Sequence, residues 1–184
     1  MKRYILFNKP YGVLSQFTGE AGQKTLADFN FPQDIYAAGR LDKDSEGLLL
    51  LTNDGPLIEK LLNPDNAHPR TYFVQVDGVP GQQDLDKLMS GLEMKGYRAK
   101  PCEAKLLTEE PKLWDRLPPI RKRKNLRTSW LQMTLIEGNN RQVRKMTAQV
   151  GFPTLRLVRS QVGGYFLDGL GLGEWMESKD FQCN

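Results

Sequence analysis

The stretch that decides the fold reads Gly39-Arg40-Leu41-Asp42-Lys43-Asp44-Ser45-Glu46-Gly47-Leu48-Leu49-Leu50-Leu51-Thr52-Asn53-Asp54-Gly55. Its four consecutive leucines, set between two glycines, are too few for an ordinary helix and predict a strand buried on both faces. Such a strand anchors the charged loop before it, and a rigidly held loop can fix a carboxylate in one geometry. Asp42 is the first candidate for that carboxylate. Because Asp also favours turns, the stretch alone leaves a purely structural role for Asp42 open.

The chain is mildly basic and of moderate length. It has 184 residues, a formal net charge of +4 and a pI near 9.0, which suits one compact unit or two small lobes that share a sheet. The positive residues are concentrated between Arg116 and Arg159. This uneven distribution favours a polyanionic partner more than the total charge does.

Several other classes of protein do not fit. No run of about 18 apolar residues exists, so we expect no membrane span, and the first residues hold too few apolar side chains for a signal peptide. We therefore expect a cytoplasmic protein. Cys102 and Cys183 fit neither a disulfide framework nor a metal site, and a single histidine, His68, excludes sites with several His ligands. We therefore expect chemistry by carboxylate, Arg, Lys or Tyr.

Hydrophobic periodicity places the remaining elements. Apolar runs and alternation predict strands over residues 4–7, 70–79, 97–107, 128–137 and 155–159. Apolar residues at helical spacing predict a capped turn over residues 25–29 and helices over residues 55–62, 82–92 and 141–150. Since strands outnumber helices and adjoin in hairpin-like pairs, we predict an α+β domain with a mostly antiparallel sheet.

Four motifs then fit one known pattern. They are Lys9-Pro10-x-Gly12, Gly39-Arg40-Leu41-Asp42 running on to Gly55, Arg70-Thr71-Tyr72, and Gly138-x-x-Arg141-Gln142-Val143-Arg144-Lys145-Met146. Their order and spacing resemble the RsuA branch of the pseudouridine synthases, over nearly the whole chain. Three positions depart from the pattern, because Asn139, Arg70 and Ser45 stand where family members commonly carry Arg, Lys and Thr.

The resemblance implies an enzyme that isomerises uridine to pseudouridine in ribosomal RNA, in the 23S RNA of the large subunit or an assembly intermediate. It implies the family's α+β core, a mostly antiparallel mixed sheet with flanking helices. We expect one catalytic domain over residues 1–184, made of two sub-lobes that share a sheet. We also expect a monomer that lacks the small S4-like RNA-binding domain found at the front of many relatives. The implied isomerisation involves no redox change and no hydrolysis, so we expect no cofactor and no metal.

The resemblance also assigns roles to residues. Asp42 corresponds to the family's catalytic carboxylate, Tyr72 to the tyrosine that stacks on the target base, and Arg144 to the arginine that pairs with the carboxylate. The residue chemistry agrees, since an Arg offers a carboxylate both opposite charge and a bidentate fork, and a Tyr ring offers uracil a flat face. Cations expected to contact RNA are Lys9, Arg40, Arg70, Arg121, Lys122, Arg123, Lys124, Arg141, Lys145, Arg156 and Arg159.

Some alternatives stay open from the sequence. Arg40 fits either an RNA contact or an ion pair with Asp44 or Glu46, and the basic run over residues 121–127 fits either an RNA contact or a solvated hairpin tip. Asp42 could act as a nucleophile, stabilise charge at the sugar, or remove the ribose 2′ proton. Two other functions compete: a non-catalytic RNA-binding or ribosome-assembly protein, and a phosphodiesterase with Asp42, Asp44 and Glu46 as metal ligands.

Overall fold

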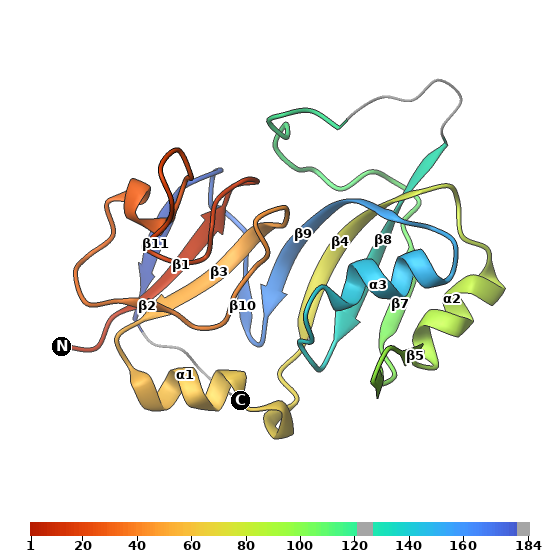
Figure 1. Ribbon diagram of the computed structural model, residues 1–184, viewed down its shortest axis with the longest axis horizontal. Coiled ribbons are helices and arrows are strands. Elements are labelled where there is room, and N and C mark those ends of the chain that lie inside the picture. The colour runs from red at the N-terminus through yellow and green to blue at the C-terminus, as the bar shows by residue number, and fades with distance from the viewer. Residues whose placement is uncertain (121–126, 180–184) are drawn as a thin grey trace. The chain divides into compact units, whose positions relative to one another are not determined.

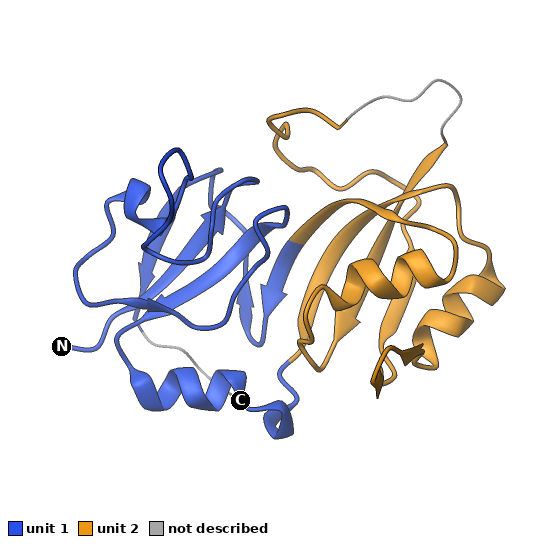
Figure 2. Ribbon diagram, viewed as in Figure 1, with its two compact units in different colours: residues 1–68, 159–184 blue, residues 69–158 orange. Residues whose placement is uncertain are grey.

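The chain leaves one folded unit after His68 and returns to it at Arg159. The computed structural model describes residues 1–120 and 127–179. Its first unit comprises Met1–His68 with Arg159–Asn184, and its second unit comprises Pro69–Val158 (Figure 2). The two units are described one at a time below.

The first unit is built on the leucine strand. This strand, β3 (Glu46–Thr52), is buried at all seven positions, as the leucine run predicts. It pairs antiparallel with β1 (Tyr4–Lys9) from Tyr4 opposite Thr52 to Lys9 opposite Gly47. On the other side of β1 lies β11 (Trp175–Ser178) (Figure 1). Further pairs are made by β2 (Tyr36–Ala37) with β3 and by β10 (Tyr165–Phe166) with the end of β9.

Short helices and aromatic rings complete this unit. The 3₁₀ turn η1 (Leu26–Phe29) begins with the predicted cap at Thr25, and Asp28 completes a capping box with it. Helix α1 (Gly55–Leu62) begins with proline in its first turn, and the turn η2 (Pro64–Asn66) follows it. Phe7 packs edge-on against Phe29 and Phe31, with ring centroids 4.8 and 5.0 Å away. These rings close one face of β1 and stabilise the unit by burial of apolar surface.

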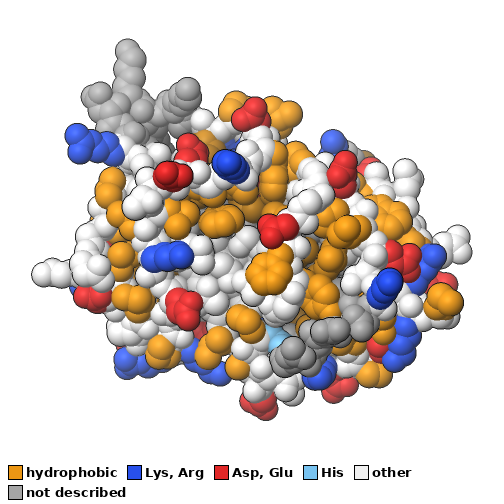
Figure 3. Space-filling model, turned by 180° about the vertical axis from the view of Figure 1, so that it is seen from behind, with side chains coloured by type: hydrophobic (Ala, Val, Ile, Leu, Met, Phe, Trp, Pro, Cys, Tyr) orange, Lys and Arg blue, Asp and Glu red, His pale blue; other side chains and the backbone are white. Residues whose placement is uncertain are grey.

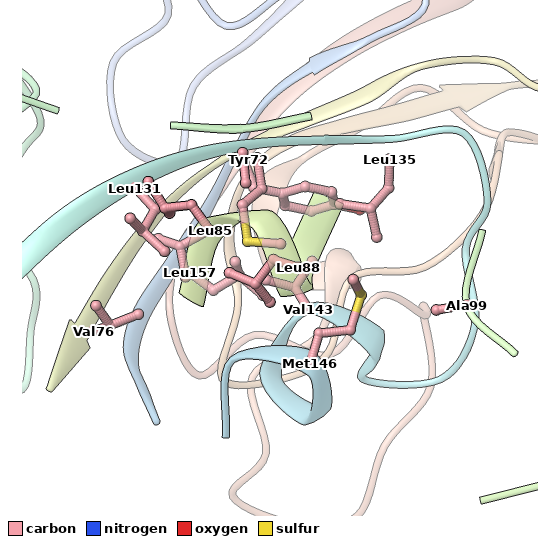
Figure 4. Close-up of a cluster of buried hydrophobic side chains, with 13 residues drawn as sticks. Tyr72, Val76, Leu85, Leu88, Ala99, Leu131, Leu135, Val143, Met146 and Leu157 are labelled. Atoms are coloured by element: carbon pink, nitrogen blue, oxygen red, sulfur yellow. The ribbon is translucent and has the colours of Figure 1, made fainter. Parts of the chain in front are cut away.

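The second unit is a sheet with two helices on one face. Its strands run in the order β9 (Thr154–Val162), β4 (Arg70–Asp77), β8 (Thr128–Leu135) and β7 (Glu103–Leu106). Strand β9 continues into the first unit after Val158. Helices α2 (Gln82–Met89) and α3 (Gln142–Gln149) send Leu88 and Met146 into the same cluster as Tyr72 of β4 (Figure 4). This cluster is the core of the second unit.

The single strand predicted over residues 97–107 is wrong. Strand β6 (Tyr97–Arg98) pairs with β5 (Glu93–Met94) in a separate two-stranded sheet, and β7 begins only at Glu103. Pro101 lies between them and has no N–H to donate to a ladder. The next residue, Cys102, donates its backbone N–H to Met89 O (3.2 Å) instead. The α+β class with a mostly antiparallel sheet is confirmed.

Within residues 1–120 and 127–179, none of the helices has the length and apolar character needed to cross a membrane.

Candidate active site

The loop that carries Asp42 is fixed on both sides by backbone contacts. Ser45 N–H donates to Asp42 O (3.0 Å) and closes the turn, while Gly12 N–H donates to Lys43 O (2.7 Å). The Ser15 hydroxyl accepts from Leu41 N–H (3.1 Å) and donates to Leu41 O (2.7 Å). The half-buried Asp42 side chain therefore starts from a backbone tied to the loop after β1 and followed directly by β3.

Lys9, the last residue of β1, is fully buried, at 0% exposure. Its ammonium donates to Pro10 O (2.9 Å) and Val13 O (2.8 Å). Burial lowers the pKa of Lys9 to about 7, and the charges of Glu46 and Asp44 act in the opposite direction. We expected an RNA contact at Lys9; the structure places its side chain inside the protein, and an RNA contact there stays a prediction.

Two further buried charges accompany Lys9. Glu46 is 1% exposed and Arg159 is 5% exposed, and Arg159 Nε donates to Leu48 O (2.8 Å) inside the protein. Among the charges around Lys9, Glu46 raises the lysine's pKa and Arg159 lowers it. The sequence did not identify Glu46 as a buried charge. The available signal was its position at the start of a strand built on four leucines. A carboxylate buried there needs a cation beside it.

Arg40 precedes the Asp42 turn and is exposed. Its guanidinium lies 3.4 Å from Gln16 Oε1, a long hydrogen bond. That contact leaves most of the guanidinium's five donors facing solvent. Its position next to the Asp42 turn keeps the predicted RNA contact open.

Tyr72 and Arg144 belong to the second unit, whereas Asp42 belongs to the first. Tyr72 is 9% exposed and packs in the core cluster with Leu135 and Val143 (Figure 4). Arg144 is half-buried in α3, one residue after Val143. The predicted stacking and pairing roles of these two side chains stay predictions.

Three predicted RNA contacts gather at the entrance to α3. Arg141 is exposed and precedes the helix in a left-handed conformation (φ 52°), and Lys145 is exposed one turn later. Arg70, at the start of β4, lies against the same loop, since a Cβ built on Gly138 would be 3.7 Å from Arg70 Cζ. The second unit thus brings Arg70, Arg141 and Gly138 together, with Lys145 on the adjoining turn.

Arg156 has a structural contact that the sequence did not reveal. It is 8% exposed, its Nη2 donates to Trp114 O (2.9 Å), and its Cζ lies 5.7 Å from the centre of the Trp114 ring. This stacked arrangement attaches the segment after β7 to the sheet. Its role as an RNA contact stays a prediction. The basic run Arg121, Lys122, Arg123 and Lys124 lies outside the described residues.

The charged surface is mixed on the face shown in Figure 3, where Lys and Arg side chains alternate with Asp and Glu. Within the described ranges, no group of three or more His, Cys, Asp and Glu side chains is arranged to hold a metal ion. What the first unit does present is the Asp42 carboxylate on a fixed loop, close enough to the buried Lys9 for its charge to act on that ammonium. A carboxylate in such a setting is suited to act as a nucleophile or base at a sugar carbon.

Comparison with known proteins gives a consistent picture. Residues 3–149 match the family model of RNA pseudouridylate synthase. The chain is 54% identical over 176 residues to ribosomal large subunit pseudouridine synthase E of Vibrio parahaemolyticus, covering 96% of this chain and 74% of that one. It is 50% identical over 168 residues to the protein of the same name from Xanthomonas axonopodis pv. citri, covering 90% and 88%.

A solved structure agrees with the sequence comparisons. The crystal structure of a pseudouridylate synthase superposes on this chain with a TM-score of 0.78 at 25% identity, covering 97% of this chain and 71% of that one. The family model, the curated relatives and the fold all lead to the same assignment. The chain therefore belongs to the RNA pseudouridylate synthase family, whose members isomerise uridine to pseudouridine in RNA.

Proposed function

We propose that this enzyme acts on ribosomal RNA of the large subunit and that Asp42 is its catalytic carboxylate. The observation that carries the proposal is the Asp42 turn, which is fixed by Gly12 and Ser15 and continues into a fully buried strand. The large-subunit substrate follows from relatives of that name at 50% and 54% identity, aligned over most of both chains.

The reaction exchanges one glycosidic bond for another. The bond between uracil N1 and ribose C1′ breaks, the uracil rotates, and C5 joins C1′ while the C5 proton leaves and N1 gains a proton. No electrons are gained or lost, so the overall change needs no redox partner. Asp42 acts at the sugar, where a carboxylate can attack C1′, stabilise its positive charge, or remove the 2′ proton.

The target uridine must first leave its stack, which costs a few kcal/mol. In this proposal the Tyr72 ring supports the extruded uracil and Arg144 pairs with the Asp42 carboxylate. Arg40 occupies the vacated space or binds a neighbouring phosphate. Arg70, Arg141 and Lys145 bind phosphates from the α3 entrance. The enzyme works in the cytoplasm as a monomer, without metal or cofactor.

A direct test uses the proton that leaves C5. Large-subunit RNA labelled with tritium at uracil C5 is incubated with the enzyme, both as protein-free RNA and as an assembly intermediate, and tritium release is counted. Wild type should release about one tritium per RNA, and the modified position is then mapped. Asp42→Asn, which preserves shape but removes the charge, should fold normally and release none.

Asp44→Asn is the matched control, because it removes a neighbouring carboxylate from the same turn, and we expect it to be much milder. Clear turnover by Asp42→Asn would move the catalytic role elsewhere. If wild type binds the RNA but releases no tritium from either substrate, a non-catalytic role in ribosome assembly replaces this proposal.

A further inference from the structure

The loop that enters α3 is closed by one buried glutamine. Gln142 is only 4% exposed, and its Oε1 accepts from the backbone N–H of Asn139 (3.1 Å). Its own backbone N–H donates to Asn139 O (3.1 Å). The glutamine thus fixes both sides of Asn139, which stands in the middle of the predicted RNA-contacting loop.

The remaining end of this side chain meets a carboxylate. Gln142 Nε2 donates to Glu137 Oε1, and the same oxygen accepts from the backbone N–H of Lys100 (2.8 Å). Glu137 is half-buried between β8 and the loop. One carboxylate therefore connects the entrance of α3 to the segment between β6 and β7.

The charge of Glu137 raises the pKa values of two neighbouring side chains. Burial is the largest cause that raises the pKa of Tyr97, and the charge of Glu137 is the second. Burial also raises the pKa of Cys102 to about 11, and the charge of Glu137 contributes to that shift. A charge acts on its neighbours in this way where the surroundings screen it weakly. Hydrogen bonds to an ionised acceptor are stronger than neutral ones, so the charge of Glu137 strengthens its contacts with Gln142 and Lys100.

The direction of each hydrogen bond is fixed by chemistry. The backbone N–H of Asn139 can only donate, so the Gln142 oxygen must face it and the Gln142 nitrogen must face Glu137. Both neighbours of Glu137, Gln142 and the Lys100 backbone, are donors. One oxygen of the Glu137 carboxylate accepts from both.

We infer that Glu137 and Gln142 form a positioning pair that sets the direction of the Arg144 side chain. Arg144 is two residues after Gln142 in the first turn of α3, so a displaced Gln142 turns that part of the helix and moves the guanidinium. The left-handed Arg141 before the helix makes this entrance unfavourable without side-chain support. The inference rests on the proposed function for its assumption that Arg144 serves the reaction.

The test exchanges the two side chains. Gln142→Glu alone places two carboxylates face to face, and we expect kcat on large-subunit RNA to fall about 100-fold, as for a misplacement of about 1 Å. Glu137→Gln alone keeps an acceptor oxygen for both donors but removes the charge, so kcat should fall by no more than about threefold. In the double variant the amide at position 137 donates to the carboxylate at position 142, and the backbone N–H groups of Lys100 and Asn139 keep acceptor oxygens, so kcat should return within about threefold of wild type.

Two controls separate positioning from a general loss of structure. KM for RNA should change much less than kcat in every variant that folds, because neither side chain of the pair is assigned an RNA contact. Glu103→Gln, which neutralises an exposed carboxylate in the same unit, should leave kcat and Tm at wild-type values. All assays are run well below the Tm of each variant.

Each outcome decides the question. A folded double variant that stays as slow as Gln142→Glu overturns the inference, and so does a folded Gln142→Glu variant with wild-type kcat. If Gln142→Glu does not fold, recovery of both folding and kcat in the double variant supports the pair, and a folded but slow double variant overturns it. Arg144→Met is assayed in parallel. Full turnover by that variant would contradict the proposed role of Arg144, whatever the exchange variants do.

Discussion

The backbone of Arg159 passes directly against Gly47, so that a Cβ built on Gly47 would lie 2.3 Å from Arg159 O and 2.9 Å from Arg159 N. Gly47 also has a φ of 99°, a conformation that L side chains rarely adopt. It follows the Asp42 turn by five residues and begins the run of leucines. The close approach of β9 to β3 therefore depends on a residue without a side chain.

Gly47→Ala should destabilise the protein by at least about 2 kcal/mol, because it adds a backbone clash to the left-handed strain of about 1–2 kcal/mol. Urea unfolding followed by circular dichroism measures this. Gly55→Ala is the control, since it opens α1 and a Cβ there meets nothing within 4 Å. That change should be neutral or raise stability by up to about 1 kcal/mol. Equal stabilities for the two variants would contradict the close approach at Gly47.

Lys9 should make the stability of the fold depend on pH in the neutral to alkaline range. Its pKa falls from 10.5 to about 7 on folding, chiefly through burial. Between these values the unfolded chain binds a proton that the folded chain has released, so stability rises with pH across this window. Below pH 7 both states are protonated, and the full penalty of burying the charge is present.

The comparison with Lys9→Met isolates this contribution, because Met fills similar space without titrating. The stability of wild type relative to Lys9→Met should rise between pH 7 and pH 10, with a slope that approaches about 1.4 kcal/mol per pH unit. Chemical denaturation at pH 6.5, 7.5, 8.5 and 9.5 gives the slope. A flat difference would show that Lys9 keeps its charge inside the protein.

Tyr72 has two predicted properties that substitution can separate. Its ring lies in the core of the second unit, so Tyr72→Ala should lower the free energy of unfolding by about 3–5 kcal/mol. Tyr72→Phe keeps the ring, and both stability and tritium release should stay near wild type if stacking on uracil is its role. A stable but inactive Tyr72→Phe enzyme would assign the function to the hydroxyl instead.

The sequence predicted the buried strand and the Asp42 loop well because both depend on local pattern. Four consecutive leucines favour a strand that is buried on both faces, and Gly47 and Gly55 limit its length. The strand predicted over residues 97–107 failed at Pro101, where a missing N–H outweighs a weak alternation. There the polar alternation reflected two short strands rather than one.

Charge was harder to interpret than hydrophobicity. Lys9, Arg156 and Arg159 were assigned to RNA because cations favour phosphate, yet all three are buried. Each of them donates to a backbone carbonyl, and that of Arg159 is 111 residues away in the chain, at Leu48. A carbonyl partner leaves no sign in the sequence, so periodicity cannot tell a buried arginine from an exposed one. The Glu137–Gln142 pair was missed for a related reason, since its third partner is the Lys100 backbone.

The last prediction separates cations that contact RNA from cations that support the fold. Lys145 is exposed at the α3 entrance, whereas Arg156 is 8% exposed and stacks on Trp114. Lys145→Gln should weaken RNA binding with little dependence on sequence. It should also make the slope of log affinity against log salt shallower by about 0.7–0.9, the value for one lost phosphate contact. Its Tm should stay at the wild-type value.

Arg156→Gln should show the opposite pattern. It removes the donor to Trp114 O and the stacked guanidinium, so stability should fall by about 1–3 kcal/mol, while the salt slope of RNA binding stays unchanged. Fluorescence anisotropy with labelled large-subunit RNA fragments at several salt concentrations, together with thermal unfolding, measures both quantities. If Arg156→Gln flattens the salt slope and leaves Tm unchanged, Arg156 contacts phosphate after all. An unchanged slope for Lys145→Gln would remove the α3 entrance from the RNA-binding surface.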